Sequence, residues 1–333
     1  MNFAWKGARK LVWRAACLTV LAALLGAAAA AAGSAEEYPS RPIRLVVPFA
    51  PGGPADFLAR LVGQKLGDAL GQQLVIDNRP GANTIIGAQI VAKAEPDGYT
   101  LLMAIDGTLV MNPFLYSKLP YDPFKDFVPI ALLASVPSAL VANDKVAARS
   151  IREMIDLEKQ KPGTFMAGSS TPTSQVAIEL LNMMAGVKMA IVPFKGGTTQ
   201  ITAELAGDIP VGMESINVSL PLYRDGKIKI LGLTSARRLS FAPDLPTIAE
   251  TYPGYDLDIW QSIVAPAGTP PVTVARLAAA LGKVMAMPDT RERLLAAGVE
   301  PAPANTPEQF AAFIRSQAET RAKVIKAVGM RLD

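Results

Sequence analysis

Arg41-Pro42-Ile43-Arg44-Leu45-Val46-Val47-Pro48-Phe49-Ala50-Pro51-Gly52-Gly53-Pro54-Ala55-Asp56 has the pattern of an apolar strand, a Pro/Gly loop and a helix start. Such a turn aims backbone N–H groups and the positive end of a helix dipole at one point in space. That point can hold an anion without any basic side chain. Many α/β units turn in this way without binding a ligand, so these residues alone predict an α/β unit and leave the site open.

Strand and helix patterns alternate along most of the chain beyond this stretch. Strands are predicted at 43–49, 74–77, 99–104, 127–133, 138–141, 164–167, 188–194, 209–213 and 228–234. Helices are predicted between them, and at 271–287 and 306–328 near the end of the chain. The alternation predicts parallel sheets flanked by helices. A second unit is expected from Ser150, where Ser150-Ile151-Arg152-Glu153 has the capping-box pattern that opens a helix.

The expected architecture is two Rossmann-like lobes joined by crossing strands, with a cleft between them. Residues 36–140 and 260–333 would form the first lobe, and residues 141–259 the second. Ligands of such sheets bind beyond the C-terminal ends of the strands. Loops rich in Gly, Ser and Thr fall at four of these ends, at 52–53, 107–108, 168–170 and 195–197. Two come from each unit, which predicts one ligand site in the cleft.

The first 35 residues have the composition of a secretory signal. Basic residues open the segment, an apolar stretch follows, and small residues end it at Ala32-Gly33-Ser34-Ala35. Cleavage is expected after Ala32 or Ala35. An uncleaved N-terminal anchor is the alternative. We therefore expect an exported, periplasmic protein.

Charge and composition exclude several classes of protein. The formal net charge is +4, and residues 1–35 carry four basic residues and no acid, so the remainder is neutral (4 − 4 = 0). A neutral chain lacks the electrostatic footprint of a nucleic-acid-binding protein. There is no histidine, and the single cysteine, Cys17, lies in the predicted signal. A His or Cys metal site and a Ser-His or Cys-His mechanism are therefore excluded, and we expect no cofactor and no metal.

Ordered motifs along the chain resemble those of the Bug family of periplasmic solute-binding proteins, the binding components associated with tripartite tricarboxylate transporters. The resemblance runs from Tyr38 to the C-terminus. Its carriers are the 47–56 part of the opening stretch, Asn78-Arg79-Pro80-Gly81-Ala82, Pro96-Asp97-Gly98-Tyr99-Thr100-Leu101-Leu102, Val192-Pro193-Phe194-Lys195-Gly196-Gly197 and Ala265-Pro266-Ala267-Gly268-Thr269-Pro270. The resemblance implies a type II periplasmic-binding fold that closes on a small carboxylate.

The resemblance also implies which residues hold the ligand. One wall would consist of Pro51, Gly52, Gly53 and Asp56, with Thr108 from the same lobe. The facing wall would consist of Gly168, Ser169, Ser170, Lys195, Gly196 and Gly197. Two more candidates come from their own chemistry: the Thr173 hydroxyl, which can serve a ligand at a cleft, and Glu214, which can bind a ligand hydroxyl or amine and stands where the family commonly has Asp. Several of these have a plain structural alternative: the hydroxyls as helix caps, Lys195 as a solvated charge, and Glu214 as the partner of a base such as Arg224. The chain departs from the family pattern at Asn83-Thr84, where Gly-Gly is usual.

The predicted function is capture of a small organic carboxylate and its delivery to the membrane subunits of a transporter, by a monomer. Dicarboxylates, aromatic carboxylates, amino acids and nicotinate-like acids all fit the resemblance. Ile85, Ile86 and Leu109 favour an aromatic or longer-chain acid. Two alternatives stay open: a receptor that presents the same closed cleft to a sensor kinase, and, more distantly, a periplasmic enzyme using Asp56 and Glu214.

Overall fold

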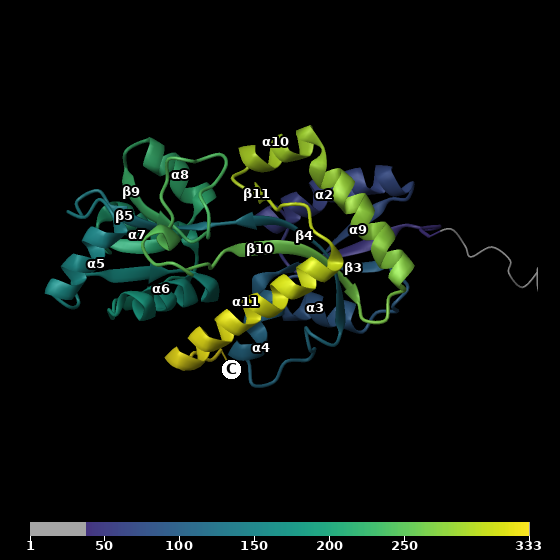
Figure 1. Ribbon diagram of the computed structural model, residues 1–333, viewed down its shortest axis with the longest axis horizontal. Coiled ribbons are helices and arrows are strands. Elements are labelled where there is room, and N and C mark those ends of the chain that lie inside the picture. The colour runs from purple at the N-terminus through teal and green to yellow at the C-terminus, as the bar shows by residue number, and fades with distance from the viewer. Residues whose placement is uncertain (1–37, 333) are drawn as a thin grey trace, which may run out of the picture. The chain divides into compact units, whose positions relative to one another are not determined.

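The computed structural model describes residues 38–332, so the predicted signal at 1–35 lies outside the described residues. From residue 41 onward the chain forms two sheets with helices packed on them (Figure 1). The predicted α/β class is confirmed. No helix within residues 38–332 combines the length and apolar character needed to cross a bilayer.

The first sheet has six strands in the order β11-β4-β10-β3-β1-β2. Their bounds are β1 Ile43–Val47, β2 Leu74–Asn78, β3 Thr100–Ile105, β4 Phe127–Val136, β10 Ile259–Pro266 and β11 Glu300–Pro301. The second sheet has five strands in the order β7-β6-β8-β5-β9. Their bounds are β5 Ser138–Asn143, β6 Met166–Ser169, β7 Ala190–Pro193, β8 Val211–Ser215 and β9 Ile228–Leu233.

Both sheets are mixed, so the prediction of parallel sheets is wrong for part of each. β1 pairs in parallel with β2 and β3, but β10 is antiparallel to β3 and β4, and β5 is antiparallel to β8 and β9. The reason is the connection between the sheets. β4 and β5 are separated only by Pro137, so the chain passes directly from the first sheet into the second, and β10 brings it back along β4 (Figure 1).

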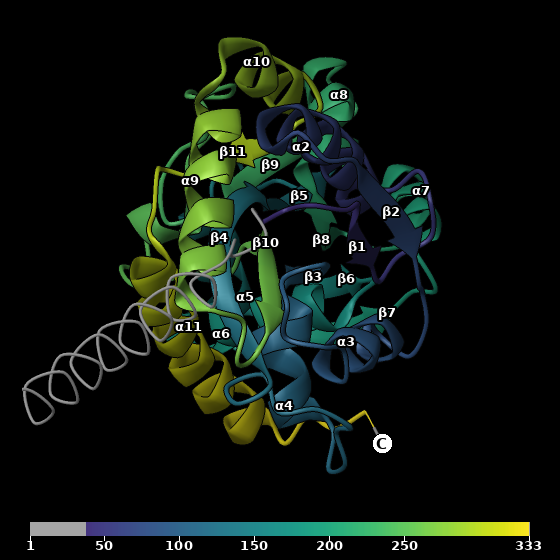
Figure 2. The same cartoon turned by 90° about the vertical axis from the view of Figure 1, so that its right-hand side faces the viewer.

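The helices flank the two sheets (Figure 2). They are α2 Pro54–Leu70, α3 Ile85–Ala92, α4 Asn112–Leu115, α5 Ile151–Gln160, α6 Pro172–Ala185, α7 Gly197–Ala206, α8 Ile216–Arg224, α9 Pro271–Ala286, α10 Pro288–Ala296 and α11 Pro307–Val328, with a π-helical turn η1 at Gly107–Met111 and a 3₁₀ turn η2 at Ile248–Glu250. Sequence reasoning missed α8 and α10. Pro221 interrupts the pattern of α8, and α10 begins immediately after α9.

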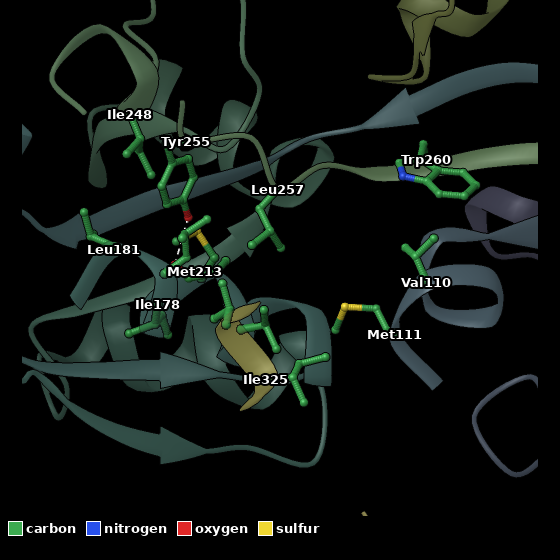
Figure 3. Packing of buried hydrophobic residues seen from close by; sticks show 14 of the residues in the cluster. Val110, Met111, Ile178, Leu181, Met213, Ile248, Tyr255, Leu257, Trp260 and Ile325 are labelled. Atoms are coloured by element: carbon green, nitrogen blue, oxygen red, sulfur yellow. Dashed lines mark hydrogen bonds between the residues drawn. The ribbon is translucent and has the colours of Figure 1, made fainter. Parts of the chain in front are cut away.

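A continuous apolar core fixes the crossing strand β10. Trp260 is 2% exposed and its ring meets Phe310 and Phe313 of α11 edge-on, with centroids 5.8 and 5.5 Å away. Figure 3 shows Trp260 near Val110 and Met111, with Tyr255 among the residues of the second sheet. The Tyr255 hydroxyl donates to the carbonyl of Ala177 in α6 at 2.9 Å. The segment that carries the chain back to the first sheet is therefore anchored on both sides.

Candidate ligand-binding site

A cavity of about 400 Å³ lies where strand ends and helix starts of both sheets meet. The first sheet contributes the loop after β1 and the residues around Ile105, and the second contributes Ser170 to Thr173 and Ser215. The crossing strand β10 contributes Ile259 and Gln261. No Lys, Arg, Asp or Glu is among the lining residues. An anion in this cavity would therefore depend on backbone groups and neutral polar side chains.

Three helices begin at the cavity wall. α2 has Gly53 as its N-cap, in an extended conformation and without a side chain to cap the helix, followed by Pro54. α6 begins at Thr171, whose hydroxyl accepts from the N–H of Ser174 at 3.0 Å, and α8 begins at Ser215 without a capping bond from that side chain. Each N-terminus carries a partial positive charge. The first-turn donors are fewer than in an uncapped helix, because Pro54 and Pro172 have no N–H and the Ile216 N–H of α8 donates to the carbonyl of Pro137 at 3.0 Å. The arrangement attracts an anion.

Asp56 holds the loop that precedes α2 in place and does not line the cavity. Its carboxylate accepts from the N–H of Gly52 at 2.9 Å, from Arg60 Nε at 2.9 Å and from Asn78 Nδ2 at 3.0 Å. The Arg60 hydrogen bond is the largest of the effects that lower the pKa of Asp56 to about 2. Asp56 is thus ionised and already satisfied by the protein. We therefore infer that Asp56 positions the loop before α2 and does not contact the ligand.

Among the thirteen residues predicted to bind ligand, Gly53, Ser170 and Thr173 line the cavity. Pro51, Gly52 and Gly196 lie on neighbouring loops outside its lining, and neither glycine has an atom within 4 Å of the place where a Cβ would be. Gly52 has φ +92°, a conformation that favours glycine for the turn itself. The ligand-binding role of all thirteen stays a prediction.

Three further predicted residues, Thr108, Gly168 and Ser169, are buried and bonded to other groups of the protein. The Thr108 hydroxyl pairs with that of Thr84 at 2.8 Å, because Gly107 opens a π-helical turn where a loop was expected. The carbonyl of Gly168 accepts from Gln200 Nε2 at 3.1 Å. Ser169 Oγ lies 2.8 Å from Ser174 Oγ within the start of α6. These residues support the walls of the cavity without being part of its lining.

Lys195, Gly197 and Glu214 are also absent from the cavity lining. Lys195 is exposed at the end of β7. A Cβ on Gly197 would come within 3.3 Å of Glu214 Oε2 and 3.9 Å of Ser170 Oγ, so Glu214 lies directly beneath the loop that contains the wall residue Ser170. Glu214 is 2% exposed, and its Oε1 has no hydrogen-bond partner among the described residues.

Glu214 and the buried Glu204 form an acidic pair below the second-sheet loops. Burial, and to a lesser extent the charge of Glu204, raise the pKa of Glu214 to about 8, while the hydrogen bond from the Ser215 N–H opposes them. Burial also raises the pKa of Glu204 to about 7, against the hydrogen bond from Gln200. Both carboxyls therefore hold their protons more tightly in the folded state than at the ordinary value of 4.5.

This pair predicts that stability falls as pH rises. The contribution of a raised pKa is complete below about pH 4.5 and is lost as the pH passes through about 7 to 8. Between pH 5 and pH 8.5 the melting temperature of Glu214→Gln should fall by roughly 5 °C less than that of the wild type. Glu319→Gln, at an exposed position, should follow the wild type. If the melting temperatures of all three proteins fall by the same amount between pH 5 and pH 8.5, the prediction is wrong.

A second cavity, of about 530 Å³, is larger but less suited to an anion. It is lined by β4, the 235–239 and 300–305 segments and α11, with Asp256 and Asp258 in its wall. Its Arg238 is bonded to Glu250 at 2.7 and 2.8 Å. No helix N-cap residue is part of its lining. We therefore assign the ligand site to the smaller cavity.

The apolar residues that the sequence favoured for the pocket do not line this cavity. Leu109 is 1% exposed in the core, Ile86 is 45% exposed, and neither they nor Ile85 line the cavity. The apolar lining instead comes from Phe49, Ile105, Met111, Val136 and Ile259. Gln261 was also missed. The only signal for it was a polar residue within the otherwise apolar strand 259–266.

Two α/β sheets joined by crossing strands, with a cavity at the strand ends, define the class of the periplasmic binding proteins. Residues 58–330 match the model of the tripartite tricarboxylate transporter family receptor. A protein encoded in the tcbD-tcbE intergenic region of Pseudomonas sp. strain P51 is 36% identical, covering 87% of each chain. The BugT protein of Bordetella pertussis is 32% identical over 95% of this chain and 99% of its own.

A solved structure of a similar protein also matches this chain over most of its length. The R. palustris protein Rpa4515, whose structure contains adipate, superposes with a TM-score of 0.75 and 32% identity, over 89% of this chain and 99% of its own. The chain belongs to the tripartite tricarboxylate transporter receptor family, which includes the Bug proteins. It is therefore a solute-binding protein of a periplasmic family and not an enzyme, as predicted.

Proposed function

We propose that this protein captures a small organic carboxylate in the 400 Å³ cavity and delivers it to the membrane subunits of a tripartite transporter. The observation that carries the proposal is the convergence of the α2, α6 and α8 N-termini on a cavity with no charged lining residue. The first-turn N–H groups of α2 and α6 would bind the carboxylate oxygens, with the hydroxyls of Ser170 and Thr173 beside them. The adipate in the similar R. palustris structure supports a carboxylate as the ligand class.

Capture would proceed by closure of the two lobes. The ligand would touch groups from both sheets, so it stabilises the closed arrangement by contacts that neither lobe supplies alone. β4–β5 and β10 connect the sheets, and rotation would take place there. Charge-assisted hydrogen bonds contribute about 1.5–3 kcal/mol each, so a few of them with apolar contact reach the −8 kcal/mol of a micromolar complex.

A thermal-shift screen tests the binding function. The protein, unfolded and refolded to remove co-purified ligand, is heated with mono-, di-, tri- and aromatic carboxylates. A ligand at 100 times its Kd should add about 2.7 kcal/mol to the free energy of unfolding, with a clear rise in melting temperature. A flat response to the whole panel would refute carboxylate capture.

Uptake in cells tests the delivery step. A strain lacking this protein should lose uptake of the acid found in the screen and regain it when the gene is restored. Unchanged uptake with normal binding in the screen would separate capture from transport and favour the sensing role.

A further inference from the structure

Gln261 is a buried amide in the cavity wall that the protein leaves unsatisfied. It lies on β10 opposite Ile105 of β3, and it is 2% exposed. Its side-chain Oε1 is buried and has no hydrogen-bond partner among the described residues. A buried acceptor without a partner costs about 1–3 kcal/mol, which is why such groups in native proteins generally have a partner. A ligand in the cavity would supply that partner.

The surroundings of Gln261 suit a neutral group and not a second anion. The cavity residues of β3, β4 and β10 near it, Ile105, Val136 and Ile259, are apolar, and the lining contains no Lys or Arg. A carboxylate here would be desolvated without a cation to pair with.

Buried acids behind this wall also disfavour a second anion near Gln261. Asp106 follows Ile105 directly and is fully buried, and burial raises its pKa to about 6, while the Gly107 N–H and the Thr173 hydroxyl lie close enough to its carboxyl to lower that pKa. Asp106, Asp256 and Asp258 all lie near Arg321, which is the cation that lowers the pKa of Asp106 and Asp258 within the described residues. Three acids face one base, so the potential at this side of the cavity is negative.

We propose that Gln261 binds a hydroxyl group carried by the ligand in addition to its carboxylate, so that this cavity selects hydroxylated monocarboxylates over dicarboxylates. A ligand hydroxyl can donate a hydrogen bond to Oε1, which supplies the partner that this oxygen lacks. The inference rests on the proposed function. It also separates this chain from the similar R. palustris protein, whose structure contains the dicarboxylate adipate.

Calorimetric titration of the wild type with two matched series tests the proposal. The aliphatic series is hexanoate, 6-hydroxyhexanoate and adipate, and the aromatic series is benzoate, 4-hydroxybenzoate and terephthalate. In the series that fits the cavity, the hydroxy acid should bind about ten-fold more tightly than its unsubstituted parent and at least about ten-fold more tightly than the diacid. A diacid that binds as tightly as the hydroxy acid, or no binding in either series, overturns the proposal. Binding of another acid in the wider screen would still leave carboxylate capture standing.

A variant links the preference to Gln261. Gln261→Leu keeps a similar volume without the amide, so the ratio between hydroxy acid and parent acid should fall to about one while the parent binds as before. Gln160→Leu, at an exposed position on α5, is the control and should keep the ten-fold ratio. If Gln261→Leu also binds the hydroxy acid about ten-fold more tightly than the parent acid, Gln261 does not bind the hydroxyl. If Gln261→Leu does not fold, the titrations of the wild type with the two series still test the proposal.

Discussion

Gly53→Asp should abolish ligand binding while making the protein slightly more stable. Gly53 is the N-cap of α2, it lines the cavity, and a Cβ built on it has no atom within 4 Å. Its φ of −83° is open to any residue. Aspartate is among the preferred N-cap residues, and replacing glycine also reduces the entropy of the unfolded chain, so a gain of about 0.5–1 kcal/mol is expected.

The same carboxylate would stand where the ligand carboxylate is held. Like charges brought together in a binding site cost several kcal/mol, which corresponds to a loss of at least about 100-fold in affinity. Gly53→Ser is the matched control, since it offers a neutral cap and should keep affinity within about three-fold. Calorimetric titration and thermal unfolding of the three proteins measure both effects. Equal affinity of Gly53→Asp and Gly53→Ser would show that the α2 N-terminus does not hold the ligand anion.

Arg321→Met should cause a large loss of stability that depends on pH. Arg321 of α11 is fully buried, and its Nη1 donates to the carbonyl of Asp256 at 2.8 Å. Burial lowers its pKa, and the nearby acids oppose that effect. Burial also raises the pKa of Asp106 to about 6 and that of Asp258 to about 7, and Arg321 holds both lower than they would otherwise be.

Removing Arg321 leaves these carboxylates buried without the cation that lowers their pKa. Breaking a buried charge cluster in this way costs about 3–5 kcal/mol. The loss should be largest at pH 8, where the acids are ionised, and smaller at pH 5, where they are protonated below their raised pKa values. Urea unfolding at both pH values measures it, and adding Asp106→Asn to Arg321→Met should recover part of the loss at pH 8. Equal destabilisation at the two pH values would point to lost packing instead of lost charge compensation.

Local patterns in the sequence were sufficient to predict most elements. The helix predicted between the first two strands is α2, and Ser150 caps α5 by accepting from the N–H of Glu153 at 3.2 Å, as its capping-box pattern predicts. These features depend on residues close in sequence. The antiparallel strands were not predictable in the same way, because periodicity does not reveal the direction in which a strand enters a sheet.

The site was predicted at the level of loops and less well at the level of side chains. The loops at 52–53 and 168–170 do supply cavity residues, because strand ends and helix starts are visible in the sequence. Asp56 and Thr108 are instead bonded to the protein itself, through contacts with residues 22 and 24 positions away. Gln261 lies on a strand more than 150 residues beyond Ile105, the β3 residue with which it pairs. Side chains so far apart in the sequence are placed near each other only by the tertiary fold.

A crystal structure of the protein with the tightest-binding acid from the screen tests the account most directly. We predict that the ligand lies in the 400 Å³ cavity, with its carboxylate within hydrogen-bond distance of first-turn N–H groups of α2 and α6. A ligand in the 530 Å³ cavity beside Asp256, or a carboxylate held by a lysine or arginine side chain, would contradict it.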